Sequence, residues 1–152
     1  AHDWSSCCRG FDSLHSHLIK MAYLIIQILS IIGFLLSVYA FKVERTRQKN
    51  KNYKAVCDIN DRVSCTKAFG SKYGKTFGLS NSVYGMVFYF VIFLLHLSGL
   101  IEYVFYLSLL SVLCSIYLAY VLYFKVRSFC LVCISVYLVN LLLLVFSYVE
   151  VF

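Results

Sequence analysis

Four long apolar stretches dominate the sequence and restrict the folds that are open to it. They run over about 21–41, 83–101, 103–124 and 129–149. A helix needs roughly 20 apolar residues to cross the hydrocarbon core of a bilayer, which is about 30 Å thick. Backbone groups in lipid must find their partners within the segment, and no alternation of period two supports a barrel, so helices are expected. The chain contains no proline that would kink them.

Composition excludes two other classes of protein. Hydrophobic residues make up 61% of the 152 residues and charged residues only 14%, where about 25% charged is typical of soluble domains. A soluble domain of this size cannot bury so much apolar surface, and a disordered chain would be far more polar. The net charge of +7 is interpreted as basic loops near lipid headgroups, so a membrane and no nucleic acid is expected as partner.

The predicted fold class is an all-α membrane protein, a four-transmembrane-helix bundle with a folded extramembrane loop between the first and second helices. A polar N-terminal tail, 1–20, precedes the four-helix domain, 21–152, and the long loop covers 42–82. Small residues four apart favour close helix packing in lipid. They occur in the first and third spans, at Gly33 and Ser37 and at Ser111, Ser115 and Ala119.

The long loop is expected to be an ordered cap over one end of the bundle. Its basic opening, 42–51, is interpreted as a solvated extension of the first helix. Glycines then alternate with aromatic residues, Phe69 and Phe77 among them, and such rings suit a segment that lies on apolar surface. The alternative is a mobile basic loop at the headgroups.

Cysteines carry the chemical signal. Cys130 and Cys133 open the fourth span, three residues apart and therefore on one helical face. A helix N-terminus there is expected to lower the thiol pKa. With Cys57 and Cys65 in the loop, the pattern favours a thiol–disulfide relay. Zinc binding and simple packing are alternatives, but the loop spacing is not that of a zinc knuckle, so no metal is expected. Cys114, in the middle of the third span, is interpreted as core.

The segments around these cysteines resemble the vitamin K epoxide reductase family over about 21–148. The matching segments are 55–58, 64–65, 77–79, 81–85, 117–120 and 129–134. One departure stands out, because the family has a longer insert where only Ser80 separates Leu79 from Asn81. The resemblance therefore implies a shorter cap in this chain.

The resemblance implies roles for the four cysteines. Cys133 would be the thiolate that attacks the quinone or epoxide, and Cys130 would resolve the adduct. Cys65 would pass electrons to Cys130, while Cys57 would meet an external thioredoxin-like thiol protein.

Four further residues are implied to bind the substrate. Asn81 and Tyr137 match groups that hydrogen-bond the two substrate oxygens, and Phe69 and Phe77 match positions lining the quinone pocket. Tyr137 also lies four residues after Cys133, on the same helical face. Two other roles stay open, because Asn81 suits the N-cap of the second span and Tyr137 suits a membrane interface.

The function implied is that of an integral membrane thiol/quinone oxidoreductase that reduces vitamin K 2,3-epoxide and vitamin K quinone, with no tightly bound cofactor. One alternative is a quinone-dependent oxidase that generates disulfides for oxidative protein folding, and another is a non-catalytic scaffold with structural disulfides. The family implies the endoplasmic reticulum membrane with lumenal cysteines. The positive-inside rule predicts a cytosolic loop instead, because ten Lys and Arg residues lie in 42–75.

Overall fold

Helices make up most of the computed structural model, which describes residues 4–59, 63–71, 75–76 and 79–152. The helices are α1 (Trp4–Lys49), α2 (Cys65–Gly70), α3 (Asn81–Leu97), α4 (Ile101–Val121) and α5 (Leu131–Val151). A π-helical segment, η2 (Leu122–Val126), continues α4. Two short strands, β1 (Lys75–Thr76) and β2 (Leu79–Ser80), pair antiparallel just before α3. The all-α fold class is confirmed.

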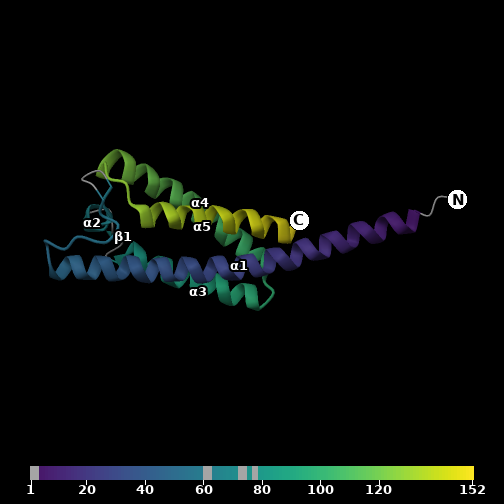
Figure 1. The fold of residues 1–152 in the computed structure, drawn as a ribbon. Coiled ribbons are helices and arrows are strands. Elements are labelled where there is room, and N and C mark those ends of the chain that lie inside the picture. Colours follow the sequence, from purple (N-terminus) through teal and green to yellow (C-terminus); the bar gives the residue numbers. More distant parts are fainter. Residues whose placement is uncertain (1–3, 60–62, 72–74, 77–78) are drawn as a thin grey trace.

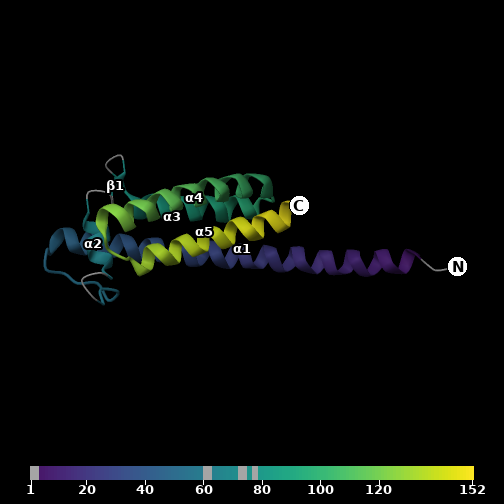
Figure 2. The same ribbon diagram turned by 90° about the horizontal axis from the view of Figure 1, so that it is seen from above.

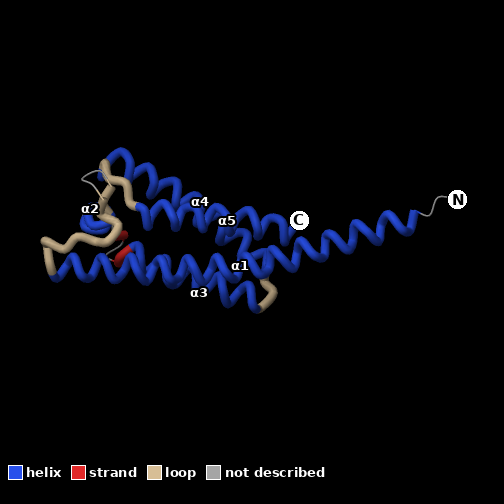
Figure 3. The backbone as a smooth tube through the Cα atoms, viewed as in Figure 1, coloured by secondary structure: helices blue, strands red, loops and turns tan. Residues whose placement is uncertain are grey.

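The four long helices lie side by side as a bundle (Figures 1 and 2). Helix α1 packs most extensively against α3 and α5, and α4 packs against α5. Helix α2 and the strands gather at one end of the bundle, and the C-terminus lies at the other end (Figure 3). The loop between the first two long helices therefore sits as a cap over one end.

Three helices in the described part of the chain are long and apolar enough to cross a membrane. They are Ser16–Lys49, Ile101–Val126 and Leu131–Val151. Helix α3 is apolar as well but has only 17 residues. Large apolar side chains cover the outer faces of the bundle, among them Leu24, Leu35, Val87, Leu110 and Leu141. The protein is thus a membrane protein, and the crossing by α3 stays a prediction.

Helix α1 is longer than the span expected from the sequence. Its 46 residues would cover roughly 69 Å at about 1.5 Å per residue. It takes in the polar segment before Met21, which was expected as a tail, and it continues through the basic run to Lys49, as the predicted helix extension does. The N-terminal part of α1 extends past the other helices (Figure 2). Elongating an existing helix costs little, because only nucleation is unfavourable, and no proline interrupts this one.

Small residues let α1 and α3 approach closely, as the sequence predicts. A Cβ added at Gly33 would lie 2.3 Å from the ring of Tyr89, and one added at Gly85 would lie 2.6 Å from Ser37 Oγ. Tyr89 is fully buried, at 1% exposure, in a cluster with Ile26 and other apolar side chains. The tyrosine ring therefore occupies the space that the absent side chain of Gly33 leaves.

A chain of hydrogen bonds crosses the middle of the bundle. The Tyr89 hydroxyl donates to Asn140 Oδ1 at 2.8 Å, and Asn140 Nδ2 donates to Ser115 Oγ at 2.8 Å. Ser115 in turn donates to the carbonyl of Ser111 at 2.8 Å. These bonds join α3, α5 and α4, and they satisfy the buried amide of Asn140, as an apolar interior requires.

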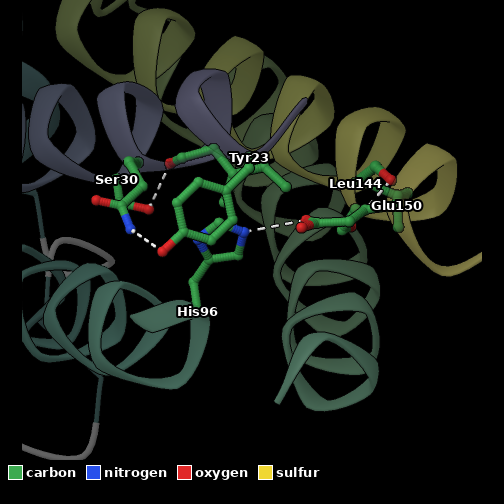
Figure 4. A network of polar contacts seen from close by, with 8 residues as sticks. Tyr23, Ser30, His96, Leu144 and Glu150 are labelled. Carbon is green, nitrogen blue, oxygen red and sulfur yellow. Dashed lines mark hydrogen bonds and ion pairs between the residues drawn. The ribbon is translucent and has the colours of Figure 1, made fainter. Parts of the chain in front are cut away.

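A second polar contact, drawn in Figure 4, joins residues near the C-terminal ends of α3 and α5, away from the cap. His96 Nε2 of α3 lies 3.0 Å from Glu150 Oε2 of α5, with both side chains almost fully buried. The ring of Tyr23, from α1, packs on His96 with 4.4 Å between ring centroids. Gln27 Nε2 donates to the Tyr23 hydroxyl at 3.2 Å. Three helices are thereby tied together at this end.

Candidate functional site: four thiols beside an apolar cavity

The loop joins the bundle by a short parallel pairing with the segment before α5. Val63 and Phe129 form a parallel β-bridge, and the Ser64 N–H donates to the Phe129 carbonyl at 3.0 Å. Ser128 Oγ donates to the Ser64 carbonyl at 3.2 Å. Because the next residues along these two segments are Cys65 and Cys130, the pairing brings the two thiols together.

A carboxylate inside the loop fixes its two cysteines relative to each other. Asp58 accepts hydrogen bonds from the Thr66 N–H at 3.1 Å and the Ala55 N–H at 3.2 Å, and also from the Thr66 hydroxyl. Burial acts to raise the pKa of this carboxyl, but these hydrogen bonds more than offset it, so the pKa is lowered. Cys57 adjoins Asp58, Cys65 adjoins Thr66, and the two sulfurs lie within 4.8 Å of each other and of an Asp58 oxygen.

The four thiols form one continuous series. The Cys57 and Cys65 side chains are hydrogen-bonded, as are those of Cys65 and Cys130 and those of Cys130 and Cys133. Cys65 and Cys130, in the middle of the series, are completely buried, whereas Cys57 and Cys133 at its ends are partly exposed. All four are free thiols in the structure. Neighbouring sulfurs in hydrogen-bond contact are close enough for thiol–disulfide exchange along the series.

Backbone N–H groups at the start of α5 point at sulfurs. Cys130 is the N-cap, and its Sγ accepts from the Cys133 N–H at 3.3 Å. The Val132 N–H donates to the sulfur of Cys65. Two of the donors that a helix leaves unpaired at its N-terminus are therefore used by the two buried thiols.

The thiols outside the membrane-spanning helices hold their protons strongly. Burial raises the pKa of Cys57 to about 11, together with its contact to Cys65. The hydrogen bond to Cys130 and then burial raise the pKa of Cys65. The pKa of Cys130, which precedes α5, is raised by its thiol's hydrogen bond to Cys133. The expected lowering by the helix N-terminus is wrong for Cys130, because this contact outweighs the backbone donor.

An apolar cavity of about 120 Å³ lies where α1, α3, α4 and α5 meet the cap. Its lining includes four of the predicted site residues, namely Phe69, Asn81, Cys133 and Tyr137. The remaining lining is mainly aliphatic, with Leu118, Val121, Leu122, Val132 and Val136 among it. The partly exposed end of the thiol series thus opens into an apolar space. Phe77, the other predicted pocket residue, lies outside the described residues.

Asn81 is the first residue of α3 and is not its N-cap, so that sequence-based alternative is wrong. Ser80 takes the cap position, and its hydroxyl accepts from the Ser82 N–H at 3.2 Å. A serine is as good an N-cap as an asparagine. With the cap position filled by Ser80, Asn81 faces the cavity.

The loop cysteines and Asp58 are also the one grouping in the described residues with the spacing of a metal site. Both oxygens of Asp58 already accept hydrogen bonds from Thr66 and Ala55. Metal coordination would compete with the bonds that hold the loop together. The expectation of no metal stays a prediction.

A membrane-embedded helical bundle in which a series of thiols leads to an apolar cavity defines a class of protein, the membrane oxidoreductases that use cysteine. The model of the vitamin K epoxide reductase family matches residues 24–148, and the chain belongs to this family. Vitamin K epoxide reductase complex subunit 1 of Rattus norvegicus is 37% identical over 139 residues, which cover 81% of this chain and 86% of the relative. The subunit of Mus musculus matches to the same extent.

Three residues that shape the site escaped the sequence-based prediction. Asp58 and Thr66 set the geometry of the loop cysteines, and Asp58 directly follows Cys57 in a segment shared with the family. Glu44, buried at 4% exposure, holds the start of α3. Its only signal in the sequence is that it is an acid inside a basic run.

Proposed function

We propose that this protein reduces vitamin K 2,3-epoxide and vitamin K quinone with electrons from Cys130 and Cys133, which a loop pair, Cys57 and Cys65, replenishes. The single observation that carries the proposal is the unbroken series of thiol contacts from the partly exposed Cys57 to Cys133 in the cavity wall. Family membership supports the substrate class.

The reducing step balances as a two-electron exchange. The thiolate of Cys133 attacks the bound ring, and the thiol of Cys130 then attacks the Cys133 sulfur, which forms a disulfide and releases the reduced ring. With the quinone, two electrons and two protons leave the thiols and give the hydroquinone. With the epoxide, the same electrons and protons give the quinone and one molecule of water.

Two further exchanges return the site to its dithiol form. Cys65 attacks Cys130 in the new disulfide and frees Cys133. Cys57 then attacks Cys65, which frees Cys130 and leaves a Cys57–Cys65 disulfide. A thioredoxin-like dithiol protein then reduces the Cys57–Cys65 disulfide and is itself oxidised to a disulfide. The two inner thiols are buried and already in contact, which supports direct transfer between them.

Asn81 and Tyr137 supply hydrogen bonds to the two oxygens of the substrate. Both line the cavity with Cys133, and Tyr137 is one helical turn beyond that cysteine. Charge develops on the substrate oxygens when the thiolate attacks, and donors in a water-poor cavity stabilise such charge strongly. Phe69 contributes an aromatic wall on which the quinone ring packs.

Turnover of vitamin K epoxide by the purified protein with dithiothreitol tests the proposal. Cys133→Ala and Cys130→Ala should each abolish turnover, because each removes one sulfur of the reducing pair. Cys114→Ala is the matched control and should retain full activity. The interpretation of Cys114 as core is wrong, because this free cysteine is exposed on α4. An active Cys133→Ala variant would overturn the proposal and leave the scaffold alternative.

The choice of reductant distinguishes the roles of the two cysteine pairs. With a reduced thioredoxin-like protein as donor, Cys57→Ala and Cys65→Ala should lose turnover, because the loop pair is the entry point. With dithiothreitol, a small reductant that reaches Cys133 from the cavity side, the same variants should remain active. Turnover of the quinone without the epoxide would favour the alternative, a quinone-dependent oxidase that generates disulfides.

The proposed location is the endoplasmic reticulum membrane, with the cap and its cysteines on the lumenal side. An oxidising compartment with thiol partners supports this orientation, although the basic residues of the loop favour the opposite one. Glycosylation tags inserted in the exposed segment near Lys51 should be modified. An unmodified tag there, with modification of a tag at the C-terminus, would refute the lumenal orientation.

A further inference from the structure

A buried carboxylate behind the cavity wall takes no part in the thiol series. Glu44 lies in α1 within a run that also holds Lys42 and Arg45, yet its exposure is only 4%. Burying a carboxylate is unfavourable unless hydrogen bonds satisfy it. Its contacts therefore indicate what the residue does.

Three uncharged side chains form hydrogen bonds with this carboxylate. Glu44 Oε2 accepts from Ser82 Oγ at 3.1 Å and from the Ser80 hydroxyl. Its other oxygen, Oε1, lies 3.4 Å from Gln48 Nε2. Ser80 Oγ also accepts from the Ser82 N–H as the N-cap of α3. One carboxylate oxygen of α1 therefore holds two hydroxyls at the start of α3, one on its N-cap and one in its first turn, where negative charge is also favoured by the helix dipole.

The two hydroxyls belong to the residues on either side of Asn81, which is predicted to bind the substrate. Asn81 lies between Ser80 and Ser82 in the chain, and both Asn81 and Ser82 line the cavity. Ala40, one helical turn before Glu44 on α1, lines it as well. The carboxylate is thus behind the part of the wall that carries Asn81, and it ties that part to α1.

We propose that Glu44 is a positioning residue for quinone reduction, which holds Ser80 and Ser82 so that Asn81 meets the substrate oxygen. This inference rests on the proposed function, because Asn81 contacts the substrate there. The side chain at position 44 must supply an acceptor oxygen that reaches the hydroxyls of both Ser80 and Ser82, and its negative charge is less important. A displacement of about 1 Å in a positioned group can cost roughly a hundredfold in rate, so losing this tie affects kcat more than KM.

Three substitutions of Glu44 distinguish the effect of its side-chain length from that of its charge. The assay is the reduction of phylloquinone with dithiothreitol. Glu44→Ala removes the acceptor and should lower kcat by about ten- to a hundredfold, with a smaller change in KM. Glu44→Asp keeps the charge but withdraws the oxygens by one methylene, so it should be similarly impaired. Glu44→Gln keeps an acceptor at the same reach and should stay within about threefold of wild type. Glu102→Ala, which removes an exposed acid at the start of α4, is the matched control and should be fully active.

A double-substitution cycle with Asn81 shows whether Glu44 acts through this residue. In an Asn81→Ala background, Glu44→Ala should cost less than about threefold more, because the group it positions is already absent. A residue needed only for folding would cost the same factor in both backgrounds. Equal costs, or an Asp variant as active as wild type beside an inactive Gln variant, would overturn the inference. An inactive wild-type protein would overturn both proposals, whereas an unimpaired Glu44→Ala variant of an active protein would overturn only this one.

Discussion

The contact between His96 and Glu150 offers a direct measure of how the bundle is held together away from the cavity. The exposed fractions of the two side chains are 0% and 2%, and their nearest atoms are 3.0 Å apart. Removing one partner of such a buried pair leaves the other without compensation, which typically costs about 3–5 kcal/mol. Replacing both partners by apolar residues of similar size is often neutral.

These magnitudes lead to a distinctive pattern of stability. His96→Leu and Glu150→Leu should each lower the free energy of unfolding by about 3–5 kcal/mol. For a chain of this size that corresponds to a fall in Tm of roughly 6–20 °C. The double variant should be more stable than either single variant, because it buries no uncompensated polar group. Glu150→Gln keeps an acceptor for the imidazole and should lie between wild type and Glu150→Leu.

Thermal unfolding in detergent, followed by helical circular dichroism, is the measurement. Glu102→Leu, at an exposed position, is the control and should leave Tm nearly unchanged. A double variant whose loss equals the sum of the two single losses would refute the coupling between His96 and Glu150. Because His96 and Glu150 lie near the C-terminal ends of α3 and α5, opposite the cap, turnover per folded molecule should stay within about twofold of wild type in every variant.

Three more predictions follow from single contacts. Gly33→Ala places a Cβ 2.3 Å from the buried ring of Tyr89, so it should cost about 1–3 kcal/mol of stability by overpacking, seen as a lower Tm. Tyr89→Phe leaves Asn140 Oδ1 without the hydroxyl that donates to it and should cost about 1–3 kcal/mol by the same assay, and an unchanged Tm would contradict this. The pKa of Cys57 is raised to about 11. The rate of its alkylation by iodoacetamide, followed by mass spectrometry, should therefore still rise with pH above the ordinary thiol pKa of about 8.5. A rate that levels off near this ordinary pKa of about 8.5 would refute the shift.

The helices were predictable because their signal is local. A stretch of apolar residues long enough for a bilayer specifies a helix by itself, and α3, α4 and α5 begin within about two residues of the expected positions. The basic C-terminal extension of α1 was expected, but its N-terminal part was not, since the residues before the apolar stretch are polar. Such residues form a helix here because the apolar stretch has already nucleated it.

The candidate site was only partly predictable, because its contacts join distant parts of the chain. Cys130 and Cys133 stand out through helical spacing, which is visible in the sequence. The bond from Ser82 to Glu44 spans 38 residues, and the contact of His96 with Glu150 spans 54. No periodic pattern links such residues. The roles proposed for Asn81 and Tyr137 come from the family resemblance, and their place beside one cavity is shown by the fold.

The sulfur that caps α5 complicates how any alteration of Cys130 is interpreted. Cys130 Sγ accepts the Cys133 N–H, so alanine at this position removes an N-cap, at a cost of about 1 kcal/mol, as well as a proposed electron carrier. Serine keeps an acceptor and lacks the redox chemistry. Comparing Cys130→Ser with Cys130→Ala therefore separates the effect of losing the helix N-cap from the effect of losing the redox-active thiol. Only the serine variant isolates the loss of electron flow.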